Sequence, residues 1–96
     1  MTFDIIPTKC FLEQIAVLGE KEKRIITEKI ELLKISPYRF KKIHSQKYSK
    51  VFRIRLMINN ADSRLIYHII EPQVILVCFL ARKDDYRDLE KYLSKM

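Results

Sequence analysis

A chain of 96 residues with 48% apolar and 32% charged side chains has the size and composition of one globular domain, residues 1–96. Its 19 lysines and arginines against 12 aspartates and glutamates give a net charge of +7, which favours a nucleic acid or an acidic protein as partner. Two distant cysteines without a neighbouring histidine pair exclude a zinc site and a disulfide scaffold. The longest apolar run is too short to span a bilayer, so we expect a cytoplasmic protein without membrane contact.

Two helices are predicted in the first third of the chain. After a candidate edge strand at residues 1–6, residues 9–18 carry apolar side chains at helical spacing, and Thr8 precedes them as a candidate N-cap. Gly19, the single glycine, stands where a helix C-cap is expected. Residues 20–35 show the next helical pattern, and the Ser-Pro pair that follows ends it. The simplest arrangement is a helical hairpin.

A basic connector follows at residues 37–50. No Asp or Glu occurs between positions 36 and 61, whereas tyrosines and a phenylalanine alternate with cationic side chains. This mixture suits a phosphate backbone with unstacked bases, although lysine-rich loops also occur on surfaces that bind nothing. The connector lysines that we predict to contact RNA are Lys41, Lys42, Lys47 and Lys50.

Three strands joined by short turns are predicted at residues 51–58, 63–70 and 74–82. The first two alternate apolar and polar side chains, which is the pattern of a sheet with one covered face. The third is apolar on both faces, as expected for a central strand. The polar face of this antiparallel meander carries Arg53, Arg55 and Arg64, with Arg82 at the end of the third strand.

A short terminal helix is predicted at residues 83–95, because Asp84 and Asp85 suit its first turn and Leu89 and Leu93 share one side. The predicted fold is therefore α+β, with an N-terminal helical hairpin packed on one face of an antiparallel β-sheet and a short C-terminal helix. The other face is expected to be open, because arginines inside strands need a partner and a polyanion would supply one.

Four motifs in this order resemble the RelE/ParE superfamily of bacterial and archaeal toxins. FKKIH (residues 40–44) matches the basic element of the family, and FRIRL (52–56) and SRLIYHI (63–69) match its two basic strands. LARKDDYR (80–87) matches the end of the last strand. The preceding helical hairpin also fits, so the resemblance covers nearly the whole chain.

The resemblance implies a toxin of a type II toxin–antitoxin system. RelE-like members are ribosome-dependent mRNA endonucleases that inhibit translation. They use no metal or cofactor, because the 2′-hydroxyl of the substrate attacks the adjacent phosphate. The implied partners are the ribosome, mRNA and an acidic antitoxin, with which the toxin forms a hetero-oligomer.

The resemblance also assigns roles to five residues. Arg53 and Arg55 match the basic pair on the first long strand of the family, and Arg64 matches a phosphate clamp on the second. Arg82 matches an arginine that acts as transition-state stabiliser or acid, and Tyr86 matches a tyrosine that stacks on a base. Tyr86 has an alternative role, which is to pack the last helix on the sheet.

The general base is the main departure from the family pattern. Arg53 and Arg55 stand where well-characterised RelE toxins carry lysines, and a guanidinium stays protonated at any working pH. Either charge stabilisation dominates or the base lies elsewhere, with His68 as the first candidate and His44 as the weaker one. The usual glycine before the terminal arginine is also replaced, by Ala81.

Two other functions remain open on the same fold. A ParE-like toxin would act on DNA gyrase by protein contact and would not need a cationic cleft. A non-catalytic relative would only bind its antitoxin. The four matched arginines favour RNA cleavage over both.

Overall fold

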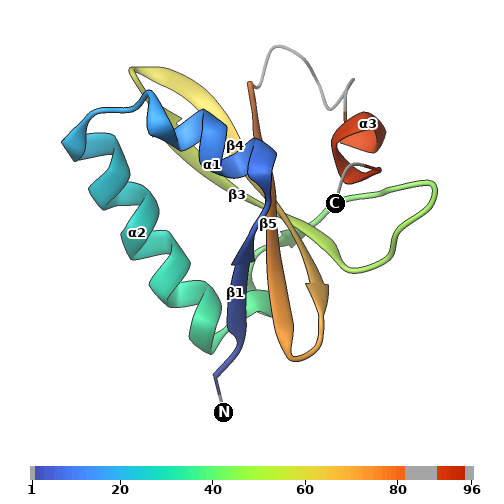
Figure 1. The fold of residues 1–96 in the computed structure, drawn as a ribbon. Coiled ribbons are helices and arrows are strands. Elements are labelled where there is room, and N and C mark those ends of the chain that lie inside the picture. The colour runs from blue at the N-terminus through green and yellow to red at the C-terminus, as the bar shows by residue number, and fades with distance from the viewer. Residues whose placement is uncertain (1, 82–88, 95–96) are drawn as a thin grey trace.

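A five-stranded sheet in the order β1-β5-β4-β3-β2 forms the centre of the computed structural model, which describes residues 2–81 and 89–94 (Figure 1). The strands are β1 (Asp4–Pro7), β2 (Lys41–Lys42), β3 (Val51–Ile58), β4 (Ala61–Ile70) and β5 (Gln73–Ala81). Strands β3, β4 and β5 form the predicted antiparallel meander, and Asn59 and Asn60 make its first turn with φ of 52° and 64°. Positive φ at both positions suits asparagine in a two-residue hairpin turn.

The sheet is mixed, so the expectation of a fully antiparallel sheet was wrong at one edge. β1 pairs parallel with β5, and Asp4 lies opposite Gln73. Alternation in the first residues indicated a strand but contained no information about its partner. The apolar character of β5 is explained by this position, because β5 lies between β1 and β4 with both faces covered.

Helices α1 (Lys9–Ala16) and α2 (Glu20–Ile35) connect β1 to the rest of the sheet. Thr8 is the N-cap of α1, as predicted: its Oγ accepts a hydrogen bond from the Phe11 amide at 3.1 Å and donates one to the Val77 carbonyl at 2.7 Å. The assignment of Gly19 as a C-cap was wrong. Gly19 is the N-cap of α2 in an extended conformation, and α1 ends earlier, with Val17 as its C-cap.

Helix α1 also continues the edge of the sheet where β1 stops. The Gln14 amide donates from Nε2 to the Phe79 carbonyl at 3.1 Å and accepts from the Phe79 amide at 2.7 Å. These two bonds satisfy strand groups that would otherwise lack a partner at the sheet edge.

The main core lies between the two helices and one face of the sheet. Phe11, Ile26 and Leu33 from the helices pack on the inward side chains of β3, β4 and β5. Phe52 stacks on Tyr67 with 5.7 Å between ring centroids, and the Tyr67 hydroxyl donates to the Pro37 carbonyl at 2.5 Å. This bond fixes the chain just after α2, which ends at the predicted Ser-Pro pair with Ser36 as its C-cap.

A second core covers part of the opposite face, which the sequence predicted to be open. Leu89 and Leu93 of α3 (Leu89–Leu93) pack over a cluster of sheet residues on this face. The buried sheet residues of this cluster are Val51, Ile66, Val77, Cys78 and Leu80. Among the described residues, β2 and the neighbouring arginines of β3 and β4 lie outside this second core. Among the described helices, none is long and apolar enough to cross a membrane.

Candidate functional site

A pocket of about 450 Å³ opens on the uncovered part of the second face, beside β2. We call it the cationic pocket. It is lined by Lys41, Lys42, Ile43, His44, Arg53 and Arg64. None of these lining residues carries a negative charge, and four of the six are lysine or arginine. Such a site attracts anions, and the low polarity of the neighbouring core strengthens the attraction.

The strand register explains why Lys41, Arg53 and Arg64 meet, whereas Lys42 lies opposite Phe52 of the main core. Lys41 of β2 lies opposite Arg53 of β3, and directly opposed residues project to the same face of a sheet. Arg64 of β4 lies opposite Arg55, two residues further along β3, and therefore diagonal to Arg53. Three strands thus contribute cations to one face. This confirms that Arg53, Arg55 and Arg64 share a face, as their alternation predicted.

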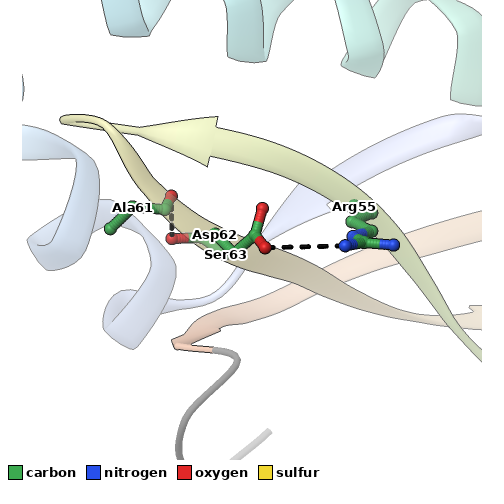
Figure 2. A network of polar contacts seen from close by, with 4 residues as sticks. All are labelled: Arg55, Ala61, Asp62 and Ser63. Atoms are coloured by element: carbon green, nitrogen blue, oxygen red, sulfur yellow. Dashed lines mark hydrogen bonds and ion pairs between the residues drawn. The ribbon is translucent and has the colours of Figure 1, made fainter.

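Arg55 is set apart from the cationic pocket. It lines a neighbouring pocket of about 380 Å³ together with Lys29 of α2, and this second pocket shares Lys41 and Arg53 with the first. Figure 2 shows its guanidinium directed along the hairpin toward Asp62, with 3.5 Å between Nη2 and Oδ2. Arg55 is also exposed, whereas Arg53 and Arg64 are half-buried. Asp62 therefore competes with any phosphate for Arg55.

Two of the four connector lysines do not line either pocket. The Lys50 ammonium lies 6.0 Å from the centroid of the Tyr38 ring, and Tyr38 packs edge-on against Phe52 of the main core. Lys47 is exposed on the connector. The two remaining candidates, Arg82 and Tyr86, lie outside the described residues.

His68 is buried next to the connector. It lies opposite Val51 on the second face with only 8% of its surface exposed, and its ring meets Tyr48 at 5.8 Å between centroids. Burial lowers the pKa of His68, and the backbone of Lys50 and Ser49 opposes this effect. His68 is therefore buried against Tyr48, and it is not among the residues that line the cationic pocket.

The connector is held by contacts that sequence patterns did not identify. The Glu90 carboxylate of α3 accepts hydrogen bonds from the Ser45 hydroxyl and from the Gln46 amide, each at 2.8 Å. These two bonds, with smaller contributions from the nearby charges of Lys47 and His44, lower the pKa of Glu90. Glu90 is far from the connector in the sequence and has the position of an ordinary surface residue on a helix. No local pattern therefore predicted its contact with the connector.

The side-chain chemistry of the pocket suits a phosphate group more than a metal ion. Lysine and arginine donate charge-assisted hydrogen bonds to phosphate oxygens and do not serve as metal ligands. Within residues 2–81 and 89–94, there is no group of three or more His, Cys, Asp or Glu side chains that could hold a metal ion.

Comparison with known proteins identifies the fold. No protein-family model and no curated protein sequence matches the chain. A solved double arginine mutant of the E. coli toxin RelE, in the free state, matches with a TM-score of 0.70 at 16% identity, over 99% of this chain and 94% of that one. The intact E. coli RelBE toxin–antitoxin complex matches with a TM-score of 0.63 at 17% identity, over 80% and 93%.

A RelBE toxin–antitoxin complex from Mycobacterium tuberculosis matches with a TM-score of 0.60 at 19% identity, over 85% of this chain and all of that one. All three similarities span most of both chains at low sequence identity. The chain therefore has the α+β fold of the RelE toxins.

Proposed function

We propose that this protein is the toxin of a type II toxin–antitoxin pair and that it cleaves mRNA on the ribosome, in the cytoplasm. The observation that carries the proposal is the cationic pocket, in which Lys41, Arg53 and Arg64 converge from three strands of a RelE-like sheet and which Lys42 also lines. A gyrase-directed toxin that acts by protein contact would not need this concentration of charge.

The pocket supplies two of the requirements of RNA cleavage. Lys41 and Lys42 are exposed at the edge of the sheet and would hold the phosphates that flank the scissile bond. Arg53 and Arg64 are half-buried, so their guanidinium groups are better placed to stabilise the charge that develops on the attacked phosphate. From the family resemblance, Arg82 would assist this stabilisation and Tyr86 would stack on a base.

Arg55 has a different role in this proposal. Its ion pair with Asp62 is exposed, and such pairs contribute little to stability. A phosphate can therefore displace Asp62 at low cost. Arg55, with Lys29 in the neighbouring pocket, would bind the RNA strand at a position adjacent to the scissile phosphate.

The antitoxin partner follows from charge. Two of the structurally similar proteins are toxins in complex with their antitoxins. With a net charge of +7, this chain would bind an acidic antitoxin segment over the same cationic pocket. The hetero-oligomer would be inactive because the segment occupies the sites of the RNA phosphates.

Primer extension on mRNA from translating ribosomes tests the cleavage. Wild-type protein should produce cuts at codons in the ribosomal A site, and Arg64→Ala should reduce the cleavage rate by about 100-fold or more, the usual effect of removing one transition-state donor. Arg55→Ala should reduce it less, because its guanidinium is shared with Asp62. Intact mRNA together with double-strand breaks trapped by gyrase would instead support the gyrase-directed alternative.

A further inference from the structure

The cationic pocket contains one residue that can exchange a proton near neutral pH. Of its six described lining residues, Arg53 and Arg64 keep their protons at any working pH, Ile43 is apolar, and the two lysines are exposed, whereas lysines that act as general bases are buried. The remaining residue is His44, and imidazole is the side chain that changes charge between about pH 5 and 8. His44 is exposed, so both substrate and solvent can reach its ring.

The backbone on both sides of His44 is anchored. The Ile43 amide donates to the Val51 carbonyl at 2.8 Å, which ties the residue before His44 to the start of β3. The Ser45 hydroxyl and the Gln46 amide donate to Glu90, which ties the residues after it to α3. An anchored backbone holds an imidazole in one position better than a free loop would.

Cationic residues of three strands line the same pocket as this imidazole. Lys41 and Lys42 come from β2, Arg53 from β3 and Arg64 from β4. Lys47 lies further along the connector, and Glu90 of α3 is near enough for His44 to affect its pKa. A phosphate bound by the cations would therefore lie beside a group able to accept a proton, with a carboxylate near enough to stabilise the imidazolium that forms.

We propose that His44 is the general base of the reaction and accepts the proton of the attacking 2′-hydroxyl. As this O–H bond breaks, the bond from the 2′-oxygen to phosphorus forms, and the bond from phosphorus to the 5′-oxygen of the next nucleotide breaks. The products are a 2′,3′-cyclic phosphate and a 5′-hydroxyl, whose proton comes from water. This assignment rests on the proposed function, and it replaces His68, which is buried against Tyr48.

The test is the pH dependence of single-turnover cleavage on ribosomes carrying a defined A-site codon. For the wild type, the rate should rise with pH as the imidazole of a general base loses its proton, between about pH 5 and 8. His44→Gln should be slower by about 100-fold or more and should lose this rise. Lys21→Gln is the matched control, because it replaces an exposed ionisable side chain on α2 by the same glutamine, and Lys21 does not line the pocket.

Chemical rescue separates proton transfer from a structural effect. His44→Ala leaves space for a small base, so added imidazole should restore part of its activity with the pH dependence of the free imidazole. Imidazole should not restore Arg64→Ala, whose defect is missing positive charge.

The possible failures are distinguishable. If the wild type cuts mRNA and His44→Gln keeps the same rate and pH profile as Lys21→Gln, His44 is not the general base, and the proposed function stands. If the wild type does not cut mRNA on ribosomes at all, the proposed function is wrong and the role of His44 fails with it.

Discussion

His68 illustrates at the scale of one residue how burial decides the role of an imidazole. Burial lowers the pKa of His68 in the folded protein, whereas in the unfolded chain the ring is hydrated and binds a proton more readily. Protonation therefore favours the unfolded state. We expect the free energy of unfolding to fall as the pH drops below about 6.5, the ordinary imidazole pKa, and to change little from His68 above it.

Urea unfolding at a series of pH values tests this expectation on the wild type and on His68→Phe. Phenylalanine keeps an aromatic ring against Tyr48 but cannot titrate, so the variant should lose less stability over the same pH interval. His44 is present in both proteins and contributes equally. Glu90, whose pKa is lowered, loses its stabilising effect as the pH falls below about 4.3, and it too is present in both proteins. Parallel curves for the two proteins would contradict the role of His68.

Thr8 has two hydrogen bonds at one hydroxyl, and both fix the start of α1 to the sheet. Because the oxygen caps the Phe11 amide and donates to the Val77 carbonyl, Thr8→Ala should lower the free energy of unfolding by about 1–2 kcal/mol. Thr8→Ser keeps the hydroxyl and should retain most of the wild-type free energy of unfolding. Thr27→Ala is the matched control: its exposed hydroxyl bonds only within α2, so its effect should stay within about 0.5 kcal/mol. Equal losses in Thr8→Ala and Thr27→Ala would refute the cap argument.

At the scale of elements, the connector and α3 behave as one unit because Glu90 joins them. Glu90→Ala removes the acceptor of the Ser45 hydroxyl and of the Gln46 amide, so the Gln46 amide should exchange its hydrogen faster. Glu90→Gln keeps a side-chain oxygen that can accept the same bonds and should exchange nearly as slowly as the wild type. Hydrogen exchange measured by NMR at Gln46 distinguishes the variants, and unchanged exchange in Glu90→Ala would show that other contacts hold the connector.

The elements with a clear period were predictable from the sequence. The 3.6-residue pattern and the following Ser-Pro pair gave the observed bounds of α2, and alternation gave those of β3. β2 was missed, because two lysines at a sheet edge have no hydrophobic pattern. The parallel pairing of β1 was missed because it depends on a partner far along the chain.

The site was predictable in its charges but not in its boundaries. Alternation placed Arg53, Arg55 and Arg64 on one face, and the register confirms it. We did not predict that α3 packs on part of that face. Cys78 and Leu80 are apolar on the same side and indicated that something must cover them. Arg55 pairs with Asp62 across the β3–β4 hairpin, and His68 is buried against Tyr48. The alternation of apolar and polar residues predicts neither contact.

At the scale of the whole molecule, the question is whether RNA binding depends on net charge or on the cationic pocket. Binding to a single-stranded RNA should weaken with salt, with the slope of log affinity against log salt near −0.7 for each phosphate contact. Removing three pocket cations together, in Lys41→Ala/Arg53→Ala/Arg64→Ala, should therefore make the slope shallower by about 2. A short RNA with 2′-O-methyl groups permits the measurement, because it cannot be cleaved.

A second triple variant removes the same net charge elsewhere. Lys21→Ala/Lys23→Ala/Arg24→Ala lies at the start of α2, on the helix that packs against the opposite face of the sheet. If the pocket binds the phosphates, this variant should keep the wild-type slope and lose little affinity, because exposed charges farther away than a Debye length of about 8 Å are largely screened at physiological salt. Equal slopes in the two triple variants would mean that RNA binding depends only on the net charge of +7. The cationic pocket would then not be the binding site.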